Sequence, residues 1–311
     1  MHILIPDDLD RSALAVFTAE GWTTDTRTGR PADQLAQDVA VADALVVRSA
    51  TRVTAALIDA APALRVIARA GVGVDTIDLA AAAGRGIVVM NAPDATTISV
   101  AELTLASLLG LARHVPAADR SMKAGRWEKK KFAGTELAGK TLGVVGCGRI
   151  GRRVAHLARA FGMTVVGADP ATVPADAGIR QVALDDLCAA ADYISLHLPV
   201  TADTRHMFDA ARLARCKAGV RLVNTARGEL IDEAALLAAL DSGHVAGAAL
   251  DVFDPEPPTG QALTGHPSVI ATPHVAASTA EAQARVGMDT ATAVRDFLVT
   301  GVARNVVAAP R

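Results

Sequence analysis

The sequence predicts an α/β protein made of two Rossmann-like or flavodoxin-like domains, each with a parallel sheet. Short runs rich in Val, Ile and Leu alternate with longer Ala-rich amphipathic runs, and this alternation is typical of parallel sheets. The apolar runs are continuous, as expected for strands buried on both faces. The alternation is interrupted by one long helical segment and then starts again, which indicates a second α/β unit.

The first series of elements occupies about the first 93 residues. Strands are expected at 2–5 (HILI), 44–49 (ALVVRS), 65–71 (RVIARAG) and 87–93 (IVVMNAP). Helices are expected between them, for example at 10–21 and 78–86. A long helical pattern follows over 97–124, and Pro116 is expected to kink it because proline lacks the amide hydrogen that a helix interior uses.

The second series contains six strand candidates and ends in a helix. The strands are expected at 141–146, 163–169, 193–199, 220–226, 246–252 and 268–274. An amphipathic helix over 278–300 closes the chain. Because this helix lies beyond the second series, it is expected to return to the first unit, which would make the first domain discontinuous.

Composition excludes several classes of partner. With 311 residues, 51% of them hydrophobic, and a net charge of −2, the chain can bury a large core but has no basic field for nucleic acid or an anionic membrane. Three scattered cysteines, Cys147, Cys188 and Cys216, predict neither a disulfide framework nor a zinc site, and no other metal site is predicted. We find no leader pattern and no apolar run long enough for a membrane span, so we expect a cytoplasmic protein.

The segment 140–170, KTLGVVGCGRIGRRVAHLARAFGMTVVGADP, predicts a dinucleotide site. Gly146, Gly148 and Gly151 have the G-x-G-x-x-G spacing between a strand and a helix, where glycine permits a tight turn and lets the backbone approach a pyrophosphate. Asp169 ends the next strand, where it can accept hydrogen bonds from a ribose and would repel a 2′-phosphate. With Pro170 next and no arginine beside it, NAD is favoured over NADP.

Three polar residues follow separate strands of the second series and predict a catalytic site. Ligands of parallel sheets bind at the carboxyl ends of the strands, where Arg227, Glu256 and His274 are found. Histidine can accept an alcohol proton near neutral pH, a carboxylate can orient its ring, and an arginine can bind a substrate carboxylate. Any one of them alone is more often structural, but the three together indicate a site. His197, after another strand, either lines the cofactor pocket or fills a strand end.

Seven blocks of the sequence resemble the D-isomer-specific 2-hydroxyacid dehydrogenases, in the order and spacing of that family. The blocks are VVRSAT, ARAGVGVDTIDL, NAPDATTISVAELT, GTELAGKTLGVVGCGRIG, LVNTARGELIDEAAL, AALDVFDPEPP and VIATPHVAAST. The likeness covers nearly the whole chain and includes no counterpart of the C-terminal regulatory domain that several members carry. Where many members have Gly and Asn in the third block, this chain has Ala95 and Thr96.

The resemblance implies roles for particular residues. Arg227, Glu256 and His274 would be the catalytic set. Val72 and Gly73 would offer backbone N–H groups to the substrate carboxylate, with Arg48 and Arg69 nearby. NAD would be contacted by Gly146, Gly148, Arg149, Ile150, Gly151, Asp169, Thr225, Ala226 and Asp251, the last of these at the nicotinamide carboxamide. A substrate domain of residues 1–97 and 283–311 would contain an inserted NAD domain, 98–282, through which relatives form homodimers or homotetramers, with the segment 125–134 at the contact.

The resemblance also implies a reaction on a small anionic 2-hydroxy acid. We expect NAD-dependent oxidation of 3-phospho-D-glycerate to 3-phosphooxypyruvate, the first step of L-serine biosynthesis. A reductase of glyoxylate, hydroxypyruvate or another D-2-hydroxy acid is the alternative within the same class. An NADH-sensing binding protein of the same fold is the alternative from a different class, and steady-state turnover would separate the two.

Overall fold

The computed structural model describes residues 1–308 and divides them into two compact units. Unit 1 consists of Met1–Thr96 together with the segment that begins at Ser278, and unit 2 is Thr97–Ala277. The boundaries expected from the sequence were 97/98 and 282/283. The last three residues of the expected segment 283–311 lie outside the described residues.

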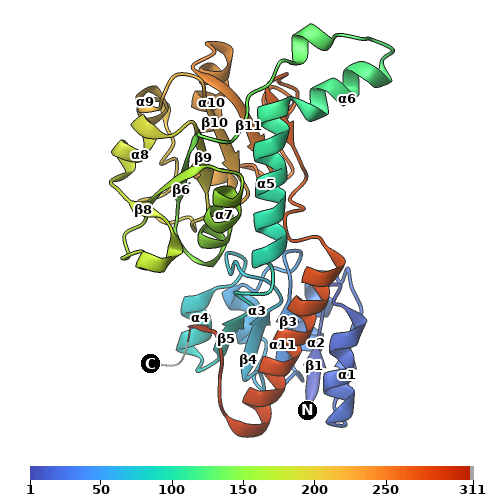
Figure 1. Cartoon of the computed structure of the whole chain (residues 1–311). Helices are drawn as coiled ribbons and strands as arrows, with labels where there is room; N and C mark the ends of the chain where they lie inside the picture. Colours follow the sequence, from blue (N-terminus) through green and yellow to red (C-terminus); the bar gives the residue numbers. More distant parts are fainter. Residues whose placement is uncertain (309–311) are drawn as a thin grey trace. The chain divides into compact units, whose positions relative to one another are not determined.

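Unit 1 contains a six-stranded sheet in the order β13-β5-β4-β3-β1-β2 (Figure 1). Its strands are β1 (His2–Leu4), β2 (Thr23–Asp25), β3 (Ala44–Val47), β4 (Val66–Arg69), β5 (Val88–Asn91) and β13 (Val306–Ala308). Its helices are α1 (Arg11–Ala19), α2 (Ala32–Val39), α3 (Ala55–Asp59), α4 (Leu79–Gly84) and α11 (Ala280–Thr300). The described pairs are parallel except β13 with β5, which is antiparallel and adds an edge strand that the sequence did not predict.

Both faces of this sheet are covered, because successive residues of each strand enter different cores. On β3, Ala44 and Val46 pack with α1 and α11, whereas Leu45 and Val47 pack with α2, α3 and α4. This alternation follows from the period of two in a strand. It explains why the strands are continuous apolar runs in the sequence.

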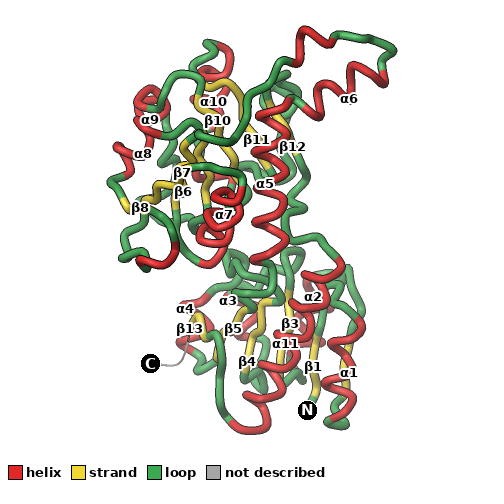
Figure 2. Tube along the Cα trace, in the orientation of Figure 1, coloured by secondary structure: helices red, strands yellow, loops and turns green. Residues whose placement is uncertain are grey.

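Unit 2 contains a seven-stranded sheet in the order β12-β11-β10-β9-β6-β7-β8 (Figure 2). Its strands are β6 (Thr141–Val145), β7 (Thr164–Ala168), β8 (Arg180–Gln181), β9 (Tyr193–Leu196), β10 (Val220–Asn224), β11 (Val245–Leu250) and β12 (Val269–Ala271). Its helices are α5 (Thr97–Arg113), α6 (Val115–Lys123), α7 (Arg149–Ala160), α8 (Leu184–Ala190), α9 (Ala210–Arg215) and α10 (Glu233–Asp241), with short 3-10 turns η1 (Lys129–Phe132), η2 (Ala175–Ala177) and η3 (Gly228–Leu230).

The described strand pairs of unit 2 are all parallel, and helices pack on both faces of its sheet. Helices α5 and α7 bury one face and α8, α9 and α10 the other. Counted from β6, the strand order is that of a doubly wound dinucleotide-binding sheet. From β6 the chain adds strands toward one edge of the sheet as far as β8, and from β9 it adds them toward the other edge, so the strand order reverses between β6 and β9. The two predicted α/β units with parallel sheets are therefore confirmed.

The helix predicted over 97–124 is two helices rather than one kinked helix. The break falls at His114, whose φ of 54° is left-handed, and the two halves meet at 65°. Pro116 lies in the first turn of α6, where a backbone N–H would have no partner within the helix, so proline costs no helical hydrogen bond. The prediction of a kink at Pro116 is therefore wrong, because the break lies two residues earlier at His114. Across the described residues, no single helix has the length and hydrophobicity to cross a membrane, and the bent α5–α6 pair meets the requirement by length and composition only.

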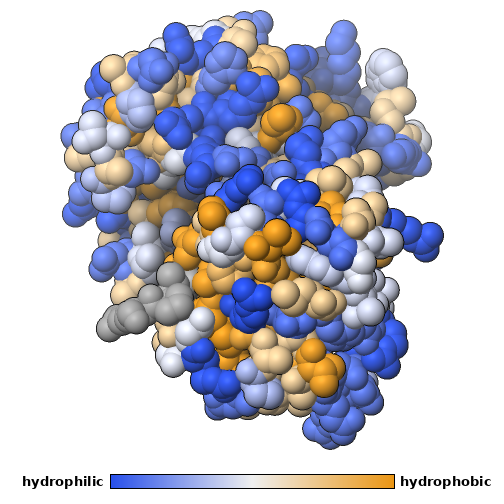
Figure 3. Space-filling model, turned by 90° about the horizontal axis from the view of Figure 1, so that it is seen from below, coloured by the Kyte–Doolittle hydropathy of each residue, from blue (hydrophilic) through white to orange (hydrophobic). Residues whose placement is uncertain are grey.

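The end of α11 lies at the surface of unit 1. Gly301 ends the helix with a left-handed φ of 77°. Val299, Val302 and Val306, at or after this end, are exposed. On the face shown in Figure 3, hydrophobic side chains interrupt a mostly hydrophilic surface.

Candidate active site

The glycine-rich loop joins β6 to α7 at the point where the strand order reverses. Gly146 has a φ of 88°, and a Cβ there would lie 2.4 Å from the carbonyl oxygen of His197. A Cβ on Gly151 would lie 2.0 Å from the carbonyl oxygen of Gly146. Gly148, by contrast, is the N-cap of α7 and has no atom within 4 Å of its Cβ position. The first and third glycines therefore serve packing, and the second leaves an open approach to the helix N-terminus.

Asp169 lies beside this loop. Its Oδ2 accepts a 2.7 Å hydrogen bond from the backbone N–H of Cys147, and its Oδ1 accepts one of 2.8 Å from Ala171. The acidic side chain and the glycine-rich turn thus lie together, as a dinucleotide ribose and pyrophosphate require. Burial and the nearby Asp169 carboxylate raise the pKa of the Cys147 thiol to about 11, so this cysteine stays protonated beside the loop.

His274 and Glu256 form a hydrogen-bonded pair in unit 2. Nδ1 of His274 lies 2.8 Å from Oε2 of Glu256, and because a carboxylate can only accept, Nδ1 carries the hydrogen. The other carboxylate oxygen, Oε1, accepts a 3.1 Å bond from the N–H of Phe253, which holds Glu256 in place. The side chains of His274 and Glu256 are 49% and 38% exposed, so the pair lies at the surface of unit 2.

Arg227 follows β10 on a turn that is fixed from two sides. The side chain of Asn224 accepts from the N–H of Ala226 (3.0 Å) and donates to the carbonyl of Arg227 (2.8 Å). The next residue, Gly228, is so close to the Phe253 backbone that a Cβ would lie 2.1 Å from its carbonyl carbon. The turn that bears Arg227 therefore packs directly against the segment that leads to Glu256.

Two further predicted residues of unit 2 are buried. Thr225, predicted to contact NAD, has its hydroxyl 3.2 Å from that of Thr104 on α5. Asp251, also predicted to contact NAD, directly follows β11, and its carboxylate faces the segment 272–276 that carries His274. Arg149 and Ile150 begin α7, directly after the open glycine.

His197 fills a strand end below the glycine-rich loop. Its Nε2 lies 2.8 Å from the hydroxyl of the buried Ser195. Desolvation lowers the pKa of His197 to about 3. The ring is therefore neutral at physiological pH, and the residue lies both at a strand end and next to the glycine-rich loop, so both possibilities left open by the sequence stay predictions.

The predicted substrate residues of unit 1 gather at the carboxyl ends of the neighbouring strands β3 and β4. The N–H of Arg48 donates to Asp7 (2.5 Å), and the Arg48 guanidinium donates to the carbonyl of Asp8 (3.1 Å). Nε of Arg69 donates to the carbonyl of Gly73 (2.8 Å). Asn91, at the end of β5, donates to the carbonyl of Val72 (2.7 Å). The Val72–Gly73 turn is thus anchored by its carbonyl groups.

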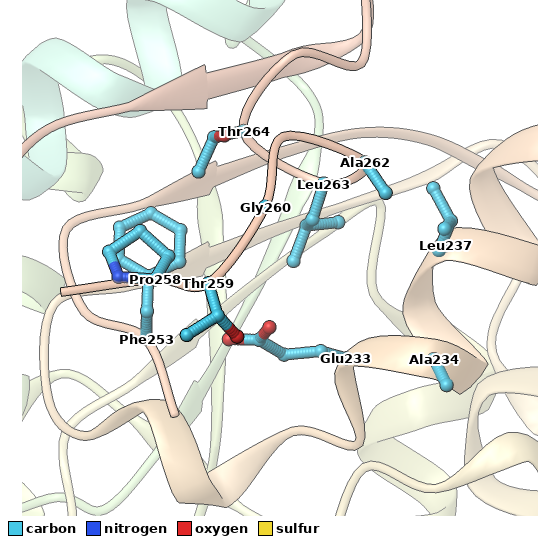
Figure 4. A pocket seen from close by; sticks show the side chains of 10 residues that line it. All are labelled: Glu233, Ala234, Leu237, Phe253, Pro258, Thr259, Gly260, Ala262, Leu263 and Thr264. Atoms are coloured by element: carbon cyan, nitrogen blue, oxygen red, sulfur yellow. The ribbon is translucent and has the colours of Figure 1, made fainter. Parts of the chain in front are cut away.

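A separate pocket of about 180 Å³ lies between the start of α10 and the segment 253–264 (Figure 4). The Glu233 carboxylate points toward Thr259 there and accepts a 3.0 Å bond from the N–H of Asp254. None of the three predicted catalytic residues lines this pocket. Within residues 1–308, no group of three or more His, Cys, Asp or Glu side chains is arranged to hold a metal ion.

Several residues that shape these loops are not identifiable in the sequence. Asn224 bonds to backbone groups of its turn, Gly228 allows a close approach of backbone, and Thr272 bonds to a side chain from another strand end, and none of these contacts leaves a local pattern. Their position at or just after a strand end is the one signal that could have found them.

Comparison with known proteins defines the class. Residues 105–276 match the family model described as the D-isomer specific 2-hydroxyacid dehydrogenase, NAD binding domain. The chain belongs to this family. The open Gly148, the turn at Gly146 and the adjacent Asp169 fit a dinucleotide, so the NAD prediction is supported both by the family and by the loop itself.

The names of individual relatives are more specific than the description of the family. A protein of Mycobacterium bovis named D-3-phosphoglycerate dehydrogenase is 50% identical over 298 residues, which are 94% of this chain and 56% of that protein. The chain therefore spans little more than half the length of that relative. The TT0316 protein of Thermus thermophilus has a TM-score of 0.92 at 37% identity, over 99% of this chain and 100% of that one. A glyoxylate reductase of Paecilomyes thermophila has a TM-score of 0.91 at 30% identity, over 99% and 98%.

Proposed function

We propose that this chain oxidises 3-phospho-D-glycerate to 3-phosphooxypyruvate with NAD, the first step of L-serine biosynthesis. The observation that carries the proposal is the 2.8 Å pair of His274 and Glu256 in the same unit as the glycine-rich loop and Asp169. The 50% identity to a protein named D-3-phosphoglycerate dehydrogenase supports this choice of substrate.

His274 supplies the proton acceptor. Its Nδ1 is occupied by Glu256, which leaves Nε2 to take the proton of the substrate hydroxyl. Glu256 fixes the ring orientation and stabilises the imidazolium that forms. Arg227 binds the substrate carboxylate and thereby orients the carbon that is oxidised. Bound NAD supplies the acceptor for the hydride that leaves this carbon.

The cofactor is held by the loop after β6. The first turn of α7, which begins with Arg149 and Ile150, directly follows the open side of Gly148, where a pyrophosphate fits. Asp169 accepts from the adenosine ribose. Thr225, Ala226 and Asp251 complete the proposed set around the cofactor.

We propose that unit 1 binds the anionic groups of the substrate. The Val72–Gly73 turn is anchored through its carbonyl groups, so backbone N–H groups of the same turn can serve a carboxylate. Arg48 and Arg69 provide the positive charge that a phosphorylated acid requires. The proposal includes the domain boundaries that the family resemblance implies, with a substrate domain of residues 1–97 and 283–311 and an NAD domain of residues 98–282.

A substrate panel tests the proposed reaction. The full chain is assayed by NADH absorbance with D-2-hydroxy acids and 2-keto acids, and 3-phospho-D-glycerate is compared with D-glycerate. We expect the phosphate to raise kcat/KM by at least about 100-fold, as a charged group recognised by arginine does. Equal efficiency with both would refute the phosphorylated substrate and leave the dehydrogenase class intact.

The same panel decides the alternatives. The likeness to a glyoxylate reductase favours, as a second candidate, a reductase of glyoxylate, hydroxypyruvate or another D-2-hydroxy acid. Such an enzyme would show its highest efficiency with the unphosphorylated keto acids. An NADH-sensing binding protein would bind NADH without turning over any acid of the panel.

We also propose a cytoplasmic homodimer or homotetramer that associates through unit 2. The three cysteines are free thiols, which suits a reducing compartment. Val115, Met122 and Trp127 expose 56%, 55% and 79% of their surface on α6 and the segment after it. Apolar residues at this density fit a subunit contact. Sedimentation of the variant Met122→Ser, Trp127→Ala is expected to show monomers where the parent protein shows oligomers.

A further inference from the structure

Asp251 contacts the segment that carries His274 through both oxygens of its side chain. Oδ1 accepts hydrogen bonds from the hydroxyl of Thr272 (2.5 Å) and the N–H of Val275 (2.9 Å), and Oδ2 accepts one from the N–H of Ala276 (2.8 Å). The carbonyl of Asp251 accepts a further bond of 2.7 Å from the N–H of His274. The residue is only 2% exposed. Four hydrogen bonds therefore join one buried residue to a five-residue turn.

This turn has a conformation that it would not adopt without support. His274 has a φ of 52°, in the left-handed region that residues other than glycine rarely occupy. The bonds to Asp251 fall on both sides of it, at Thr272 before and at Val275 and Ala276 after. Fixed on both sides, His274 keeps the backbone angle that points its Nδ1 at Glu256.

The support is itself rigid. Asp251 follows β11 directly, and its N–H donates to the carbonyl of Asn224 at the end of the neighbouring strand β10 (2.9 Å). The His274 turn is thus tied to the middle of the unit 2 sheet rather than to another loop.

We propose that Asp251 is a positioning residue that holds His274 in reach of Glu256 and so sets the rate of proton transfer. This inference rests on the proposed role of His274. It adds to the contact with the nicotinamide expected from the sequence and does not replace it, because an ionised carboxylate has about four acceptor positions and the turn uses three of them.

The chemistry of the contact requires a carboxylate. Three donors converge on the side chain, so both of its oxygens must accept. An asparagine would present its NH₂ group to one of these donors, and a buried donor would lose its partner. The Asp251→Asn change is therefore expected to release one side of the turn although it is nearly isosteric.

Thr272 offers a test that avoids the cofactor. Thr272→Val removes the hydroxyl donor, whereas Thr272→Ser keeps it. We expect kcat to fall about 10-fold in Thr272→Val and about 100-fold in Asp251→Asn, because a misplaced catalytic group loses rate steeply with distance. KM for the substrate and Kd for NADH should change by less than about three-fold in Thr272→Val. Thr272→Ser should stay near the parent rate.

A second measurement does not depend on turnover. Hydrogen exchange of the Val275 and Ala276 amides, followed in the protein without NAD, should accelerate at least about ten-fold in Asp251→Asn while amides of β10 and β11 stay protected. Faster exchange with no turnover of any acid by the parent protein would keep the positioning role and reject the proposed function. Three results would each overturn the positioning role. The first is unchanged exchange in Asp251→Asn, and the second is a Thr272→Ser variant as slow as Thr272→Val. The third is an Asp251→Asn variant that binds NADH more weakly but keeps the parent kcat.

Discussion

At the scale of single residues, the proposed chemistry depends on which nitrogen of His274 is free. The bond from Nδ1 to Glu256 fixes the tautomer and leaves Nε2 as the acceptor. Glu256 is held in turn by the N–H of Phe253, so both members of the pair are oriented by contacts within unit 2. An active site that is oriented in advance spends less substrate binding energy on alignment.

Replacing Glu256 tests this orientation. Glu256→Gln keeps the shape but removes the negative charge beside the imidazolium, so kcat should fall about 100-fold, within the usual contribution of an acid–base group. NADH binding, measured by fluorescence titration, should be unchanged. Glu233→Gln is the matched control, because Glu233 also accepts a backbone N–H near this segment but does not contact His274. Equal rates in the two variants would contradict the assignment.

His197 predicts a pH dependence of stability. Its pKa is about 3 in the folded protein and about 6.5 when unfolded, so below pH 6.5 the unfolded chain gains a proton that the folded state refuses. The contribution of neutral His197 to the free energy of unfolding is fully present above pH 6.5 and is lost as the pH falls toward 3. Because the side chain is only partly buried, we expect the free energy of unfolding to fall by less than about 2 kcal/mol from pH 7 to pH 5. Urea unfolding of His197→Asn at both pH values should show a smaller drop than the parent protein; equal drops would count against this role.

The sequence could predict the three residues to which we assign the proposed chemistry, but not the residues that hold them in place. Arg227, Glu256 and His274 each follow an apolar run, and the carboxyl end of a parallel strand is a known place for ligands. Asn224 and Thr272 could not be assigned a role, because their partners are a backbone turn and a side chain from a different strand end. Asp251 was linked to the cofactor alone, since no pattern shows that 272–276 folds back onto it.

At the scale of elements, the three glycines between β6 and α7 differ in what surrounds them. The Cβ positions of Gly146 and Gly151 are filled by backbone atoms, whereas that of Gly148 is empty. Sequence spacing alone treats the three glycines alike. The structure assigns them different tasks.

Two alanine variants distinguish these tasks. Gly151→Ala places a methyl group against the Gly146 carbonyl and should lower the free energy of unfolding by about 2 kcal/mol, as overpacking does. Gly148→Ala should leave thermal stability nearly unchanged but weaken NADH binding about 10-fold or more, because a methyl group stands where the pyrophosphate approaches. Calorimetry and fluorescence titration measure the two effects. Normal NADH affinity in Gly148→Ala would show that the cofactor does not approach this face.

The elements that the sequence missed are the short ones. β2 and β8 consist of polar residues, Thr23–Asp25 and Arg180–Gln181, at or near the edge of a sheet, where the apolar run that marks a buried strand is absent. β13 pairs with β5 only because α11 brings the chain back to unit 1. The break at His114 depends on a left-handed residue, which histidine adopts too rarely to be predicted.

At the scale of the whole molecule, the chain leaves unit 1 after Thr96 and returns to it at Ser278. Each buried hydrophobic cluster lies within one of the two units. Two consist of unit 1 residues and two of unit 2 residues, and α11 contributes to the core of unit 1 although it follows unit 2 in the chain. The sequence could predict this return, because the last helix lies beyond the second series of strands, but the points of crossing have no pattern of their own.

The division predicts that unit 2 folds and binds NADH by itself. A fragment of residues 97–277 contains both of its core clusters, the glycine-rich loop and Asp169. We expect it to unfold cooperatively in urea and to bind NADH within about three-fold of the affinity of the full chain, since independent domains keep their own core and ligand contacts. It should not turn over substrate, because Arg48, Arg69 and the Val72–Gly73 turn belong to unit 1. The same fragment with Gly148→Ala is the control and should lose NADH affinity without unfolding. A fragment without secondary structure by circular dichroism, or one that folds but binds NADH more than about ten-fold more weakly, would show that unit 2 depends on unit 1 for its fold or for its cofactor site.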